Sequence, residues 1–210
     1  MNRFGDFLNL LTPMMKPMGF SKKGNSFYLK DGVNYGILNF QKSRENTKEV
    51  VRFTINFGIY SSVLAELCSR SDTLIKPKVE QCHWIAWVGN FLPNSPDYWW
   101  SIRVLDNLND VVCDVIEIVQ HIILPEIKKR LSDEDLMNSW INDYYAGTTE
   151  LGRFIYLTKL LKVKGDFEAL YGVIERFMKH SKGTPNEIRA IEHLMEIEYS
   201  YEEVEKTNRK

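Results

Sequence analysis

Polar and tyrosine side chains recur at every second position in three neighbouring stretches between residues 28 and 60. Their guanidinium and amide groups could bind an anion or a polypeptide backbone, because these groups present hydrogen-bond donors in fixed directions. The tyrosines would add rigid contact area. The set predicted to form one binding surface is Tyr28, Tyr35, Asn39, Gln41, Arg52, Thr54, Asn56 and Tyr60.

Three strands must form for these side chains to share a face. Residues 51–60 alternate between apolar and polar or glycine positions, which is typical of a half-buried strand. Residues 27–30 and 33–41 flank Asp31-Gly32, a strong signal for a two-residue hairpin turn. We therefore expect two consecutive antiparallel hairpins.

The two turns also predict a register. A turn at Asp31-Gly32 pairs Phe27 with Gly36, and a loop at 43–49 pairs Phe40 with Phe53. Both registers gather the apolar residues on one face, and a slip by one residue would destroy this agreement. On the opposite face the expected neighbours are Gln41 with Arg52, Asn39 with Thr54, and Gly58 with Tyr35 and Tyr28. Whether the C-terminal helices cover this polar face is left open, since antiparallel sheets often expose one face.

In the rest of the chain, secondary structure is predicted from the spacing of apolar residues and from the prolines and glycines that end helices. A fourth strand is expected over 81–88, where Trp84 and Trp87 would point to opposite faces, and Pro125 is expected to kink or end a long helix. The expected helices are 3–16, 61–68, 105–122, one after Ser132, 148–163, 166–180 and 184–203. The predicted fold class is α+β: a short antiparallel sheet of about four strands packed against helices in residues 1–131, with a helical extension in 132–210 packed on it.

Four short motifs resemble one known family. They are Gly-Phe-x-Lys-x-Gly-x-x-Phe at 19–27, Phe-Gln-Lys-Ser at 40–43, Phe-Thr-Ile-Asn-Phe-Gly-Ile at 53–59 and Asp-Tyr-Trp-Trp at 97–100. In order and spacing they resemble the bacterial family called domain of unknown function 4304, over about residues 4–130. The resemblance implies no reaction, cofactor or catalytic residue.

Other groupings of reactive residues are better explained by packing or solvation. Cys82 and His83 are adjacent, and adjacent strand residues point to opposite faces, so the histidine could not readily activate the thiol. Trp99-Trp100 is expected to clamp the end of the sheet to the long helix, and His180 and His193 are expected to be exposed. Four residues whose side chains could bind a metal recur along one side of a predicted helix, and this side is expected to face solvent: Asp110, Asp114, Glu117 and His121. We predict no catalytic residue, no metal site and no cofactor.

Composition narrows the class of protein. The formal net charge of the 210 residues is -1, which creates no strong field for nucleic acid or anionic lipid. The three cysteines, Cys68, Cys82 and Cys113, are odd in number and far apart, as in proteins of reducing compartments. The first residues do not resemble a secretory signal, and the longest apolar helical pattern carries acidic residues. We therefore expect a cytoplasmic protein without a membrane span.

The favoured function is a non-enzymatic intracellular interaction module that docks a protein partner on the polar face, with Gln41, Arg52 and Tyr60 as anchors. A toxin-neutralising immunity role is one form of it. The alternative is a small-anion-binding protein or an enzyme that uses the same face as a pocket, with Arg52 gripping the anion. A weaker third hypothesis is RNA binding through the more basic first half of the chain.

Overall fold

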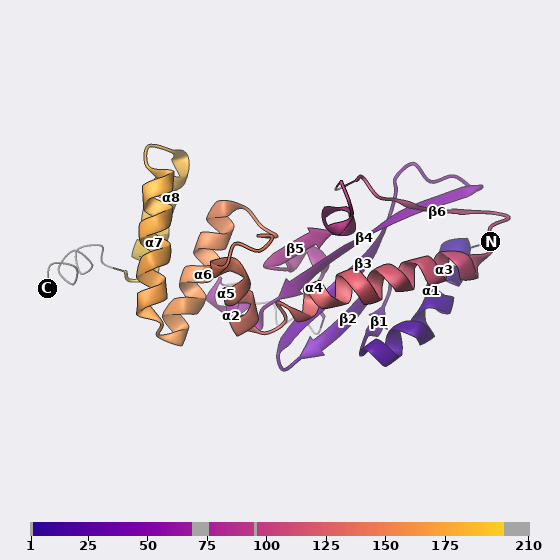
Figure 1. Cartoon of the computed structure of the whole chain (residues 1–210), viewed down its shortest axis with the longest axis horizontal. Helices are drawn as coiled ribbons and strands as arrows, with labels where there is room; N and C mark the ends of the chain where they lie inside the picture. Colours follow the sequence, from indigo (N-terminus) through magenta and orange to yellow (C-terminus); the bar gives the residue numbers. More distant parts are fainter. Residues whose placement is uncertain (1, 69–75, 95, 200–210) are drawn as a thin grey trace, which may run out of the picture. The chain divides into compact units, whose positions relative to one another are not determined.

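The structure is a computed structural model that describes residues 2–68, 76–94 and 96–199 (Figure 1). Its fold is α+β, as predicted, with an antiparallel sheet packed against helices and further helices towards the C-terminus. Two compact units divide it: the sheet unit, Met1–Ser62 with Ser71–Leu136, and the helical unit, Val63–Arg70 with Met137–Lys210. None of the helices in the described residues is long and apolar enough to span a bilayer.

In the described residues the sheet has six strands, two more than expected: β1 (Ser21–Lys23), β2 (Ser26–Asp31), β3 (Asn34–Lys42), β4 (Val50–Tyr60), β5 (Trp84–Trp87) and β6 (Trp100–Arg103). The order is β1-β2-β3-β4-β5, and β6 also pairs with β4 (Figure 1). Strand β5 pairs with residues 56–59 of β4 and β6 with residues 50–53, so both occupy one edge. The sequence does not predict β1 and β6, because strands of three or four residues are too short to show alternation.

The predicted register is wrong by two residues in both hairpins. Phe27 lies opposite Leu38, and Phe40 opposite Ile55. The first turn is formed by Gly32-Val33, where only Gly32 has a positive φ, 52°, which is characteristic of a type II′ turn. Because two is an even number, every side chain still lies on the predicted face.

The loop between β3 and β4 explains the second shift. The side chain of Asn46 accepts a hydrogen bond from Arg52 N at 2.6 Å and donates one to Arg52 O at 3.1 Å. The Arg52 carbonyl also accepts the Ser43 N–H at 2.9 Å, so Ser43 keeps the strand register while the Asn46 amide binds the Arg52 N–H, and the regular pairing starts at Lys42 and Phe53. The cross-strand neighbours on the polar face therefore differ from those expected: Gln41 faces Thr54, Asn39 faces Asn56, and Gly58 faces Ile37.

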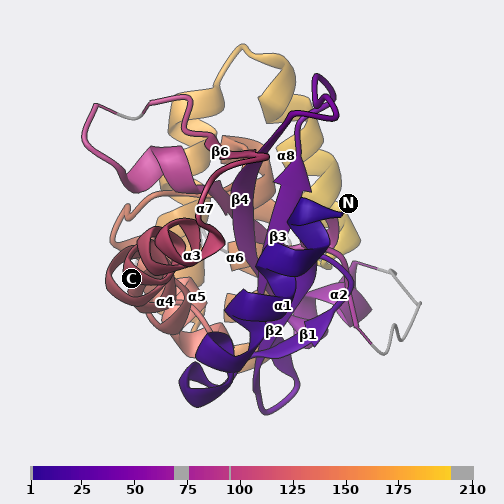
Figure 2. The ribbon, with the colours of Figure 1, turned by 90° about the vertical axis from the view of Figure 1, so that its right-hand side faces the viewer.

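Helices cover the apolar face of the sheet. The sheet unit contains α1 (Arg3–Met15), α3 (Leu108–Ile118), a π-helix (Val119–Ile123) and α4 (Leu124–Lys128), and α1 lies beside α3 (Figure 2). Phe7 of α1 packs on Phe53 with 4.8 Å between ring centres, and Trp100 stacks on the same ring at 5.4 Å. A Cβ on Gly36 would clash with the side chain of Ile127, so α4 lies directly against β3.

Pro125 was expected to kink or end the long helix, but the helix does not end there and continues to Lys128. Because proline has no N–H to donate to the preceding turn, the helix widens into the π-turn that ends at Ile123 before α4 begins. The part of the sheet unit that the structure describes also contains three short 3-10 helices: Lys16–Met18, Val79–Gln81 and Val88–Phe91.

The helical unit contains α2 from Val63, the last part of α5 (Asp133–Ile141), α6 (Glu150–Lys164), α7 (Phe167–Ser181) and α8 (Pro185–Glu196); α2 as a whole spans Ser62–Leu67. A left-handed Gly165, φ 75°, ends α6, and the Asp166 side chain caps α7. Phe154 and Phe177 stack between these helices at 4.1 Å. The last helix was expected to reach residue 203; α8 ends at Glu196, and the residues from 200 lie outside the described ranges.

Candidate functional site

All eight residues of the predicted surface lie on the sheet face opposite the apolar core, but their burial divides them. Tyr28, Thr54 and Tyr60 are buried, with exposures of 5%, 3% and 8%. Tyr35, Asn39 and Asn56 are half-buried, whereas Gln41 and Arg52 are exposed. The face therefore has a tyrosine end that is covered and an arginine end that is open.

Residues 76–83 cover the tyrosine end. The Lys76 ammonium lies 4.8 Å from the ring centre of Tyr28, and the rings of Tyr60 and His83 are 5.5 Å apart. A Cβ on Gly58 would lie 2.8 Å from Cβ of Cys82, so this cysteine covers the glycine whose expected neighbours were Tyr35 and Tyr28. Burial raises the pKa of the Tyr28 hydroxyl.

Tyr60 is also remote from the other two predicted anchors. It lies eight residues from Arg52 along β4, which is about 26 Å at ~3.3 Å per residue. Gln41, by contrast, faces Thr54, two residues from Arg52. The structure thus brings Gln41 and Arg52 together and places Tyr60 at the covered end.

Hydrogen bonds hold the arginine end in a fixed arrangement. Trp87 donates its indole N–H to Thr54 Oγ1 at 2.6 Å, and the same hydroxyl donates to Tyr98 O at 2.9 Å. Asn56 donates from Nδ2 to Oε1 of Gln41 at 2.5 Å. These bonds join β3, β4, β5 and the segment before β6, so the side chains on this part of the face are ordered without a ligand.

Arg52 lies at the centre of the open end. Its guanidinium carbon is 5.8 Å from the ring centre of Trp99, and a guanidinium nitrogen is 3.9 Å from Glu45. The Arg52 side chain is 45% exposed and that of Glu45 83% exposed, so this ion pair contributes little to stability. We call the exposed and half-buried residues here the arginine patch: Gln41, Arg52, Asn56, Trp87 and Trp99.

Trp99 and Trp100 were both expected to clamp the sheet to the long helix, and this prediction is wrong for Trp99. Trp100 packs on the core side, where it stacks on Phe53 and donates from Nε1 to Asp114 at 2.6 Å. Trp99 lies by Arg52 on the polar side, and its N–H is held by Asp97 at 2.7 Å. The alternation of neighbouring strand residues could have separated the two rings, had β6 been recognised.

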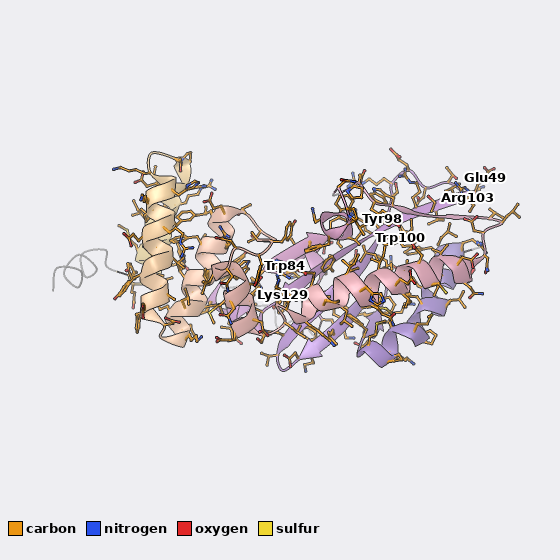
Figure 3. The ribbon with its side chains drawn as sticks, in the orientation of Figure 1. Glu49, Trp84, Tyr98, Trp100, Arg103 and Lys129 are labelled. Carbon is orange, nitrogen blue, oxygen red and sulfur yellow. The ribbon has the colours of Figure 1, made fainter. Side chains whose placement is uncertain are left out.

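A stiff apolar turn follows β6 at the same end of the sheet, where Figure 3 shows Arg103 and Glu49. The N–H of Arg103 is bonded to the Asp106 carboxylate at 2.7 Å, and the Arg3 guanidinium donates to the carbonyls of both residues. The turn holds Leu105, a residue that is 96% exposed, and Val104, which is 50% exposed. Two apolar side chains are thus presented to solvent by a fixed backbone.

Groups with catalytic or metal-binding chemistry are arranged for structural roles. Burial raises the pKa of the Cys82 thiol, and Nδ1 of His83 accepts the backbone N–H of Ser61. Asp114, from the predicted solvated stripe, accepts the Trp100 N–H. Within residues 2–68, 76–94 and 96–199, no three His, Cys, Asp or Glu side chains are grouped to hold a metal ion.

His193 was expected to be exposed and is buried, with 4% exposure. Its Nε2 lies 2.7 Å from Oγ1 of Thr158, and that hydroxyl donates to Phe154 O at 2.8 Å, so the ring nitrogen is the donor. Burial, and secondarily Lys159, lower the pKa of His193 to about 4. The apolar stripe of Ala190, Leu194 and Ile197 would have placed this histidine on the inner face of α8.

The comparisons with known proteins bear on the sheet unit. The family model described as Domain of unknown function (DUF4304) matches residues 11–129, which is more than half of the chain. This match confirms the resemblance indicated by the four sequence motifs. No curated protein and no solved structure matches the chain.

Proposed function

This chain belongs to the family of domain of unknown function 4304, and from that premise we propose that it is a non-enzymatic, intracellular docking module whose arginine patch binds a protein partner. The observation that carries the proposal is the preordered, open arrangement of Arg52 and Gln41 beside Trp87 and Trp99. Arginine and tryptophan are enriched among the residues that dominate binding energy at protein interfaces.

Polar groups of the patch remain available to a partner. Among the described residues, the Gln41–Asn56 bond uses one amide atom of each side chain, which leaves the Gln41 NH₂ group and the Asn56 carbonyl oxygen for further hydrogen bonds. Within the described part of the chain, Glu45 at 3.9 Å is the one acidic side chain that contacts the Arg52 guanidinium, so a carboxylate on the partner could displace that glutamate.

The spread of the groups favours a protein over a small anion. The donors and rings of the patch come from three strands and from Trp99, and they lie along an open antiparallel face rather than converging on one point. Small-molecule sites are concave and bury most of the ligand. The exposed Leu105, at the same end of the sheet, adds an apolar contact that a protein could receive in a pocket.

The state of the three cysteines supports the intracellular location in this proposal. Cys68, Cys82 and Cys113 form no disulfide, and proteins of reducing compartments keep their thiols unpaired. An immunity protein that neutralises a toxin is one form that such a module could take.

The test is affinity capture from cells of the source organism, followed by titration of the captured protein in purified form. Four baits are used in parallel: the wild-type chain, the double variant Gln41→Ala/Arg52→Glu, Leu105→Asp and Arg189→Glu. Arg189 is an exposed arginine of α8, outside the sheet unit, and it is the matched charge-reversal control.

The proposal expects a partner that binds wild type and Arg189→Glu equally and is lost by the double variant, with Leu105→Asp weakening it. Equal binding by the double variant and wild type would remove the arginine patch from the function. Capture of RNA, with steep salt dependence, or binding of a small anion that requires Arg52 would replace protein docking by the corresponding alternative.

A further inference from the structure

The helical unit contains a cavity of about 220 Å³ between α5, α6 and α7. Its floor is apolar and largely aromatic. Phe154 and Phe177 stack with 4.1 Å between their centres and 16° between their planes, and both are buried. Trp140 completes the floor and is fixed by a 2.8 Å hydrogen bond from Nε1 to Ala146 O. Phe154 and Phe177 turn one ring face to each other, so the floor offers the remaining apolar surface of rings that packing holds in place.

The rim of the same cavity carries charged side chains, of which some form ion pairs and one does not. Arg153 binds Asp143 at 2.7 Å, and Nε2 of His180 lies 3.7 Å from Glu150. Arg176 lines the cavity from α7, one turn before His180, and pairs with no acidic side chain in the described part of the chain. One guanidinium thus remains for an anion at the rim.

We propose that this cavity binds a small organic anion that joins a flat apolar body to a carboxylate. The body lies against Phe154, Phe177 and Trp140, where burial of apolar surface and contact with the rings stabilise it. The carboxylate is bound by Arg176, whose planar guanidinium matches its geometry. The cavity is smaller than the usual ~300–1,000 Å³ of small-molecule sites, which limits the body to one ring or two fused rings.

This site is independent of the arginine patch, because every residue that lines it belongs to the helical unit. The two proposals can therefore fail separately. A variant at Arg176 leaves the sheet unit untouched, and a variant at Arg52 leaves the cavity untouched.

The experiment compares 2-naphthoate with its neutral analogue 2-naphthamide, using the full chain. Titrations are followed by amide chemical shifts in NMR spectra and by the fluorescence of the tryptophans. The variants are Arg176→Gln, the matched control Arg189→Gln on the exposed face of α8, and Val173→Phe, which fills the cavity from a half-buried lining position.

Wild type is expected to bind naphthoate saturably, with shifts concentrated around residues 140–180. Arg176→Gln should weaken naphthoate binding about two- to fivefold, the effect of a partly exposed ion pair, and leave naphthamide binding unchanged. Arg189→Gln should change neither, and Val173→Phe should abolish both.

Absence of saturable naphthoate binding, shifts centred outside the cavity, or equal effects of Arg176→Gln on both probes would overturn the proposal. If Val173→Phe fails to fold, the proposal is still tested by comparing how Arg176→Gln and Arg189→Gln change the binding of naphthoate and of naphthamide.

Discussion

Trp87 and Thr54 are joined across the edge of the sheet by a 2.6 Å hydrogen bond from the indole N–H to the threonine hydroxyl, which donates its own proton to Tyr98 O. Thr54 is 3% exposed, so its one oxygen satisfies two groups that would otherwise lose their partners. The bond couples β4 to β5 and to the segment before β6. It thereby orients the tryptophan that the arginine patch uses.

Replacement of this hydroxyl should destabilise the sheet unit. Thr54→Val keeps the shape of the side chain but leaves the Trp87 N–H and the Tyr98 carbonyl without their partner, at a cost of about 1–3 kcal/mol. Trp87→Phe removes the same bond from the other side. In urea unfolding, the double variant should lose about 1 kcal/mol less than the sum of the two single losses. Strict additivity would show that the bond does not contribute to stability.

Two glycines should respond in opposite directions to substitution by alanine. A Cβ on Gly58 would lie 2.5 Å from the carbonyl oxygen of Trp84, which is backbone and cannot move aside, so Gly58→Ala should destabilise by about 1–3 kcal/mol. Gly172 lies inside α7, and no atom outside the local helix lies within 4 Å of the place that its Cβ would take, so Gly172→Ala should stabilise by about 0.5–1 kcal/mol. Thermal unfolding of both variants measures this; a loss of stability in Gly172→Ala would contradict the packing of α7.

The stability of the helical unit should depend on pH through His193. Its pKa is lowered to about 4 in the folded chain, against an ordinary value of 6.5, because of burial and then because of Lys159, while Glu196 acts in the opposite direction. The unfolded chain therefore binds a proton that the folded chain does not, between pH 6.5 and 4. The contribution of this neutral histidine is complete above pH 6.5 and is lost as the pH falls towards 4.

The measurement is urea unfolding followed by circular dichroism at several pH values. His193→Gln should flatten the dependence of the unfolding free energy on pH between pH 6.5 and 4. If the unfolding free energy of His193→Gln depends on pH as steeply as that of wild type, groups other than His193 cause the dependence.

The cysteines should differ in reactivity. Burial raises the pKa of Cys82, so the reactive thiolate is scarce near neutral pH, whereas Cys113 is exposed on α3. Iodoacetamide should therefore label Cys113 at least about tenfold faster than Cys82, because a rise of a single unit in the Cys82 pKa already lowers its thiolate fraction about tenfold. Peptide mass spectrometry of the native chain gives both rates. Labelling of unfolded protein is the control, since it should remove the difference, and equal rates in the native chain would contradict the cover that Cys82 forms over Gly58.

Local periodicity was sufficient to predict much of this fold. Alternation in β4 assigned each side chain to a face, and the assignment survived the two-residue error in register because pleating repeats every two residues. The same period-based reasoning predicted the α6–α7 hairpin, whose breaker at Gly165 is local. It failed for β1 and β6, which are too short to show a period and form only by pairing with neighbouring strands.

The open and covered ends of the polar face depend on contacts between segments far apart in the chain. Residues 76–83 cover the tyrosine end, and Trp87 and Trp99 arrive at the arginine end from β5 and from the residue before β6. Alternation alone decides that Tyr60 and Arg52 share one face of β4. Only tertiary packing buries Tyr60 and leaves Arg52 exposed. Burial depends on which distant segment of the chain lies over each position, and the alternation of residues along one strand does not contain that information.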